Sequence, residues 1–190
     1  KAAVFNNGTV TIQNGKFIRS LETGVSPKEK GDNSFYTVLN HGIMTVENGT
    51  FENSGKFSSL FENGYYTYAS TDSRSGYVES TNQTAPSLTI NGGSFSGGVN
   101  AIKNDDGGVL EITGGTFENV TQFCVMTYSN ASITGGTYKI SDSASAAIYC
   151  EGDKTAPTDL GKLGISGNLG KIILANDADV TLSGDVTTDV

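Results

Sequence analysis

One short phrase recurs along the chain and constrains its fold more than any other feature. Its order is apolar, any, apolar, any, Gly or Asn, Gly, any, aromatic. The five strong copies are Val10–Phe17, Met44–Phe51, Leu88–Phe95, Leu110–Phe117 and Ala131–Tyr138, and weaker copies begin at Leu163 and Val180. Leu88 and Leu110 are 22 residues apart, and Leu110 and Ala131 are 21 apart, so the basic repeat has that length and longer spacings contain insertions.

The apolar-any-apolar step has a period of two, which predicts a short strand with one buried face. The Gly or Asn-Gly pair supplies the positive φ of a sharp corner. Three short strands per repeat, each pairing with the same strand of the next repeat, describe a parallel β-solenoid. We therefore predict an all-β, single-stranded parallel β-helix of about seven coils of roughly 21–22 residues with loop insertions. No segment sustains the 3.6-residue apolar period of a helix.

Stacking such coils predicts columns of like residues inside the solenoid. The predicted aliphatic column is Ile12, Val46, Ile90, Ile112, Ile133, Ile165 and Leu182, and the aromatic column is Phe17, Phe51, Phe95, Phe117 and Tyr138. A second line, upstream of each phrase, ends at Asn6, Asn40, Asn63, Asn104, Thr127, Cys150 and Asn176. Because five of these seven residues are Asn, we expect a ladder of side-chain amides at one corner.

Composition excludes several classes of protein. The chain has 25 Gly among 190 residues but only 3 Pro and no three-residue period, which rules out collagen and a disordered linker. Its net charge of −8 offers no basic surface for nucleic acid. The longest apolar runs are short pieces such as residues 172–175, so no membrane insertion and no signal peptide are expected. We expect one domain over residues 1–190, cut from a longer chain.

The repeated phrase, its glycine corners and the Asn line resemble the repeats of right-handed parallel β-helix, pectin-lyase-like domains in large surface proteins of gut Firmicutes and related bacteria. The resemblance covers roughly residues 1–186. It implies a right-handed β-helix located outside the cell or on the bacterial cell surface. It implies no particular activity, because solenoid folds carry many functions.

Three insertions interrupt the repeat, at about 18–34, 65–87 and 152–162, and binding residues favour loops held by a rigid frame. The second insertion contains four of the eight tyrosines. Tyr rings stack on sugars, while acids and Arg bond hydroxyl groups, so this loop is a candidate glycan site. Its candidate residues are Tyr65, Tyr66, Tyr68, Asp72, Arg74 and Tyr77. The alternative is that these tyrosines only cover the flank of the solenoid.

Asp105 and Asp106, at an expanded corner, are the candidate acids. Adjacent carboxylates on an extended chain point to opposite sides, so catalysis would need partners from neighbouring coils. The two interpretations are a solvated acidic turn and a weak Ca²⁺ site, and no other cofactor is expected. His41 is the single histidine, and we expect it to be a solvated turn residue.

Cys124 and Cys150 are predicted to be free thiols. In the coil alignment Cys124 matches Ala147, three residues before Cys150, and that offset of roughly 10 Å along a strand exceeds the reach of a disulfide. Strand alternation sends Cys150 into the core and Cys124 outward.

These observations favour a non-catalytic cell-surface module that presents loops for adhesion or carbohydrate binding, or acts as a rigid spacer, with a glycan or host-surface ligand as partner. The alternative is a polysaccharide lyase or glycoside hydrolase of the pectin-lyase-like class acting on uronic-acid polysaccharide. A net charge of −8 would repel such a substrate unless calcium bridged the two. Unpaired strands at the two ends also predict end-to-end self-association.

Overall fold

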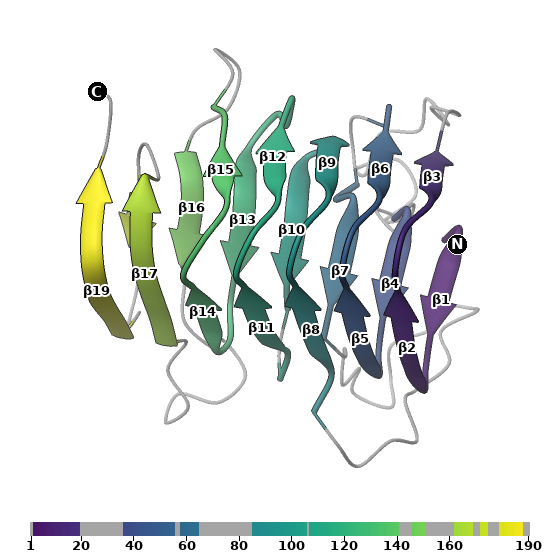
Figure 1. Ribbon diagram of the computed structural model, residues 1–190, viewed down its shortest axis with the longest axis horizontal. Coiled ribbons are helices and arrows are strands. Elements are labelled where there is room, and N and C mark those ends of the chain that lie inside the picture. Colours follow the sequence, from purple (N-terminus) through teal and green to yellow (C-terminus); the bar gives the residue numbers. More distant parts are fainter. Residues whose placement is uncertain are drawn as a thin grey trace, which may run out of the picture.

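The computed structural model describes residues 2–19, 36–55, 58–64, 85–105, 107–140, 146–150, 162–168, 172–174 and 179–187. Within these ranges every regular element is a strand, and all strand pairs are parallel. Strands of three sheets follow one another in turn along the chain as far as β15, and the strands stack along the long axis of the molecule, from β1 at one end to β19 at the other (Figure 1). The protein is an all-β parallel β-helix, as its repeat predicts.

Up to β17 each sheet takes every third strand in chain order, and β18 and β19 then extend sheets A and B. Sheet A contains β1 (Val4–Asn6), β4 (Val38–Asn40), β7 (Phe61–Asn63), β10 (Asn100–Asn104), β13 (Phe123–Thr127), β16 (Ala146–Cys150) and β18 (Ile172–Leu174). Sheet B contains β2 (Thr9–Ile12), β5 (Ile43–Val46), β8 (Ser87–Ile90), β11 (Val109–Ile112), β14 (Ala131–Ile133), β17 (Lys162–Asn168) and β19 (Asp179–Thr187). Sheet C contains β3 (Lys16–Arg19), β6 (Thr50–Asn53), β9 (Ser94–Gly97), β12 (Thr116–Glu118) and β15 (Thr137–Tyr138).

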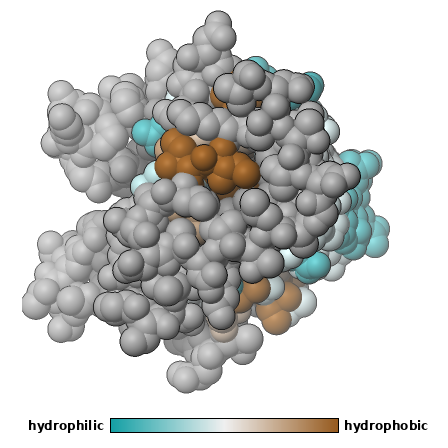
Figure 2. All heavy atoms as spheres, turned by 90° about the vertical axis from the view of Figure 1, so that its left-hand side faces the viewer, coloured by the Kyte–Doolittle hydropathy of each residue, from teal (hydrophilic) through white to brown (hydrophobic). Residues whose placement is uncertain are grey.

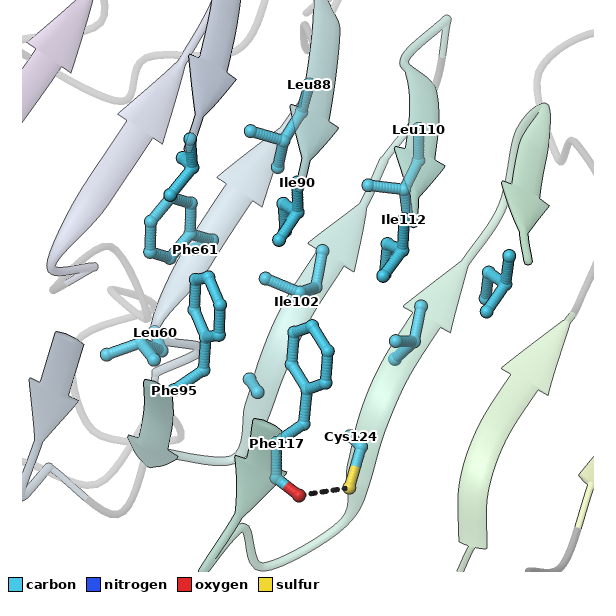
Figure 3. Packing of buried hydrophobic residues seen from close by; sticks show 14 of the residues in the cluster. Leu60, Phe61, Leu88, Ile90, Phe95, Ile102, Leu110, Ile112, Phe117 and Cys124 are labelled. Atoms are coloured by element: carbon cyan, nitrogen blue, oxygen red, sulfur yellow. Dashed lines mark hydrogen bonds between the residues drawn. The ribbon is translucent and has the colours of Figure 1, made fainter. Parts of the chain in front are cut away.

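The strand register confirms that the residues of both predicted columns pair in order. The aliphatic residues from Ile12 to Leu182 pair in sequence order across sheet B. The aromatic residues from Phe17 to Tyr138 pair across sheet C, with adjacent ring centroids 4.7 to 5.0 Å apart and nearly parallel planes. Phe61 of sheet A meets Phe51 and Phe95 edge-on, which links the stack to the rest of the core. Figure 3 shows Phe61 beside Phe95.

The predicted Asn ladder is confirmed over four coils. Asn6 Nδ2 donates to Asn40 Oδ1 over 2.7 Å, Asn40 to Asn63 over 2.7 Å, and Asn63 to Asn104 over 2.8 Å. Asn104 Nδ2 donates to Thr127 Oγ1, 3.1 Å away. Each amide also donates to backbone carbonyls near the corner, so these buried polar groups are satisfied.

The expected place of Asn176 in this ladder is wrong. Ile148 pairs with Ile172, and Cys150 therefore pairs with Leu174, two residues before Asn176. Apolar residues occupy the ladder position at this end, and Asn176 itself lies outside the described residues.

The two glycines of the phrase have different roles. At Gly135 a Cβ would lie 2.0 Å from the carbonyl oxygen of Thr113 in the preceding coil, so the first glycine permits the close approach of two backbones. Gly136 has φ +103°, which an L side chain rarely adopts, so only the second glycine meets the expectation of positive φ.

The strands include some of the residues that the sequence analysis assigned to the ends of the insertions. Ile18 and Arg19 belong to β3, Ser87 to β8 and Lys162 to β17, because their backbones continue the strand pairing.

Both cysteines are free and buried, so the prediction of free thiols is confirmed and the outward position of Cys124 is wrong. Alternation fails at the start of β13, where Cys124 and Val125 are consecutive and both fully buried. The Cys124 thiol donates to the carbonyl oxygen of Phe117 at 3.6 Å (Figure 3). Burial raises the pKa of Cys124 to about 12, so this thiol is unreactive at neutral pH.

Candidate functional site

The outward positions of sheet A bring together two acids and a lysine from two adjacent strands. Glu62 in β7 and Lys103 in β10 are direct partners in the parallel register. Asp105 comes two residues after Lys103 and directly follows β10, and the contact between the two side chains places them on the same side of the backbone. We call Glu62, Lys103 and Asp105 the outer triad.

The outer triad is buried, although it lies outside the hydrophobic core. The side chains of Lys103 and Asp105 are 16% and 6% exposed, and they form an ion pair between Nζ and Oδ2. Glu62 is 4% exposed, and its carboxyl group hydrogen-bonds to Asp105 and to the Tyr36 hydroxyl. Lys103 Nζ also lies 5.8 Å from the ring centroid of Tyr128. Burial makes each of these polar contacts stronger than it would be in water.

One proton is held between the two carboxyl groups of the outer triad. Desolvation is the largest cause that raises the pKa of Glu62, and the charge and hydrogen bond of Asp105 add to it. The positive charge of Lys103 and the Tyr36 hydroxyl lower it, and the result is a pKa of about 8. At neutral pH Glu62 therefore donates a hydrogen bond to the Asp105 carboxylate, while Lys103 balances the one negative charge.

Only Asp105 among the predicted site residues lies in the described part of the chain. The expectation of a solvated acidic turn is wrong for Asp105, because Lys103 and Glu62 enclose its carboxylate. Asp106 lies outside the described residues. The predicted glycan residues Tyr65, Tyr66, Tyr68, Asp72, Arg74 and Tyr77 also lie outside them.

Sequence reasoning missed Glu62, Lys103 and Tyr36. The signal for the first two was already in the aligned line, where Phe61-Glu62-Asn63 and Ile102-Lys103-Asn104 occupy adjacent coils. Middle residues of this line point outward, so opposite charges at adjacent middle positions predict a pair across two coils. Tyr36 precedes β4 and carries no such signal.

His41 is buried and not the solvated turn residue that we expected. It is 2% exposed, and its ring meets that of Phe5 edge-on with centroids 5.3 Å apart. Desolvation lowers the pKa of His41, so its imidazole is neutral at neutral pH.

The chemistry available at this face is that of a proton-holding carboxyl pair beside an amine. In the described ranges no group of three or more His, Cys, Asp or Glu residues is placed to hold a metal ion. Two other ion pairs, Lys16–Glu52 and Lys139–Glu118, have lysines that are 61% exposed, so they contribute little to stability.

No family model, curated protein or solved structure matches the chain. No helix in the described part of the chain is long and apolar enough to cross a membrane.

Proposed function

We propose that this protein is a non-catalytic β-helix module that serves as a rigid scaffold for the segments interrupting its strands. The observation that supports it is the continuity of the interior: the aromatic stack runs from Phe17 to Tyr138, and the Asn ladder runs beside it from Asn6 to Thr127. Each coil joins the next through parallel pairing in all three sheets over this length. A frame built in this way holds the ends of an inserted segment at fixed positions.

The finer form of this proposal is a pectin-lyase-like, right-handed β-helix exposed on a bacterial cell surface, with a glycan or host-surface ligand bound by the second insertion. This insertion follows Gly64, directly after β7, the strand that carries Glu62. The support for an exposed location is the sequence resemblance and the acidic composition.

A glycan-array screen tests the ligand. Replacing Tyr65, Tyr68 and Tyr77 together by Ser should abolish binding, because the stacking faces for sugar rings are lost. A matched control replaces Thr9, Thr11 and Thr45 of sheet B by Ser, which leaves these tyrosines unchanged. Equal binding by the Tyr variant and the native chain would remove the insertion from the proposal.

The second candidate is a polysaccharide-cleaving enzyme, and the outer triad is the observation that favours it. Glu62 holds a proton beside the Asp105 carboxylate, with Lys103 as a positive neighbour. However, paired glycosidase carboxyl groups are separated by roughly 5 to 9.5 Å so that sugar or water fits between them. Two carboxyl groups in direct hydrogen-bond contact leave no such space, which favours the scaffold.

Incubation with pectins, alginate and glycosaminoglycans separates the two candidates. The scaffold predicts neither unsaturated products by absorbance nor new reducing ends. Cleavage by the native chain that is lost in both Glu62→Gln and Asp105→Asn would replace the scaffold by the enzyme.

Self-association through the ends is part of the same proposal. The first coil has partly exposed apolar residues in each sheet, Val4, Val10 and Phe17, and β1, β2 and β3 are each the outermost strand of their sheet. The end that contains β19 shows a hydrophobic patch on its surface (Figure 2). Sedimentation velocity should therefore show species larger than a monomer that dissociate on dilution. A monomer at all concentrations would contradict this.

A further inference from the structure

The Lys103–Asp105 pair differs from the other ion pairs between described residues because water has little access to it. The Lys103 side chain is 16% exposed, whereas the lysines of the Lys16–Glu52 and Lys139–Glu118 pairs are each 61% exposed. An amine and a carboxylate held in contact away from water pay a desolvation cost that a neutral group in their place would avoid.

A third group, Glu62, completes the arrangement. Its carboxyl group hydrogen-bonds to the Asp105 carboxyl group and faces the Lys103 ammonium group across the β7–β10 pair. Glu62 thus contacts Asp105 directly and lies close enough to Lys103 for the positive charge of the amine to act on its carboxyl group. Neither of the exposed lysine–glutamate pairs has a second carboxyl group in its described contacts.

We propose that Lys103 and Asp105 become joined by an amide bond in the folded protein, with Glu62 as the proton carrier. The Lys103 ammonium group first gives one proton to the Asp105 carboxylate, which leaves a neutral amine and a carboxylic acid, and the loss of two charges from a buried site lowers the cost of this step. Lys103 Nζ then attacks Asp105 Cγ to form the C–N bond. Glu62 gives its proton to the departing oxygen and takes one from the amine, so that one water molecule leaves and Glu62 is restored.

No oxidant or other reactant is needed, because condensation of an amine with a carboxylic acid releases only water. The structure supplies the driving factor that such a reaction lacks in solution, which is the fixed contact between the reacting groups. Effective molarities for well-oriented intramolecular reactions reach roughly 10⁵ to 10⁸ M. The product replaces a buried positive and a buried negative charge by one neutral amide, which removes their desolvation penalty.

The mass of the native chain tests the bond directly. The intact protein should weigh less than its sequence by one water molecule, and denaturation should not restore the difference. Trypsin normally cleaves after Lys103, but it does not cleave after a lysine whose amine is acylated. We expect a single peptide over residues 75–139, lighter by one water, in place of the two peptides 75–103 and 104–139.

Peptide mapping also separates the proposed bond from a common artefact. Asp106-Gly107 can lose water to form a succinimide, which would lighten peptide 104–139 but leave cleavage after Lys103 intact. Lys139 serves as the internal control. Its Nζ lies 2.8 Å from Glu118 Oε2 in an ion pair that water can reach, and trypsin should cleave after it normally. Complete cleavage after Lys103 with both peptides at their sequence mass would overturn the proposal.

Two variants test the roles of the residues. Lys103→Arg keeps the positive charge but should show the full sequence mass, because a guanidinium group does not act as the nucleophile. Glu62→Gln keeps the size of the side chain and should lose at least nine-tenths of the linked peptide. Circular dichroism before digestion confirms that each variant is folded. Equal linkage in folded Glu62→Gln and in the native chain would overturn the assignment of Glu62.

Discussion

The Asn ladder and the outer triad are two solutions to the same problem, the burial of polar side chains. The ladder uses neutral amides at one position of successive coils, so each residue donates to one neighbour and accepts from the other. The outer triad occurs once, and its members differ in kind: a carboxylate, an ammonium group and a carboxyl group that keeps its proton. The stability that neutral amides contribute does not change with pH, whereas the stability that the titratable groups of the outer triad contribute does.

The largest effect is expected from breaking the ladder at its centre. Asn63→Ala removes the acceptor of Asn40 and the donor to Asn104 and to the carbonyl oxygen of Val109. The free energy of unfolding should fall by about 2 to 4 kcal/mol, because buried groups on both sides lose their partners. Denaturant titration monitored by circular dichroism measures this change.

Asn14→Ala is the matched control for the ladder. Asn14 accepts a hydrogen bond from the Gly15 amide at an exposed corner, so its loss should cost less than about 1 kcal/mol. Equal losses for Asn63→Ala and Asn14→Ala would show that stacking of the amides does not matter.

A smaller effect concerns the pH dependence that the outer triad, and not the ladder, should have. The folded-state pKa of Glu62 is about 8, against an ordinary 4.5, so the folded chain binds this proton more tightly than the unfolded chain does. Stability from Glu62 is therefore greatest below pH 4.5 and declines as the pH rises to about 8. We expect a lower Tm at pH 8 than at pH 6.5 in Lys103→Arg, which keeps the positive charge but cannot form the amide, and a smaller difference when Glu62→Gln is added to it.

The titration of His41 sets the lowest pH at which the effect of Glu62 on Tm can be measured separately. The pKa of His41 is lowered from 6.5 by burial, so protonation in the unfolded state favours unfolding below that pH and opposes the trend from Glu62. Above pH 6.5 the imidazole is mostly neutral in both states. Identical pH dependence of Lys103→Arg with and without Glu62→Gln in that range would contradict the assignment of the shared proton.

The smallest effect is expected at an exposed ion pair. Glu118→Gln removes the partner of Lys139, which is 61% exposed. The free energy of unfolding should change by less than about 1 kcal/mol, and added salt should reduce the change further. A loss as large as that of Asn63→Ala would mean that surface charge, and not the interior, sets the stability.

The sequence predicts the parts of the fold that repeat. The phrase from Val10 to Phe17 and its later copies contain both the strand period and the corner glycine, so the register of sheets B and C follows from aligning the copies. Asn6, Asn40, Asn63 and Asn104 are predictable for the same reason, because stacking places equal positions in contact.

Features that occur once are harder to predict. Burial of His41 depends on contact with Phe5 in the preceding coil, and burial of Cys124 depends on a local break in alternation. Opposite charges at Glu62 and Lys103 could be found by alignment, but their burial and the shared proton depend on three-dimensional packing around Tyr36 and Tyr128. The repeat therefore makes the scaffold predictable from the sequence, whereas the candidate site can be found only in the three-dimensional structure.

Cysteine cross-linking between adjacent coils tests the central claim, an in-register parallel stack, most directly. Thr45 and Thr89 are partners on the outer side of sheet B, and neighbouring strands lie about 4.8 Å apart, within reach of a disulfide. Thr45→Cys with Thr89→Cys should form a disulfide on mild oxidation, shown by intact mass and reversed by reductant. Thr45→Cys with Glu111→Cys, two coils apart, should not. A disulfide in the second pair but not in the first would contradict the register on which the scaffold depends.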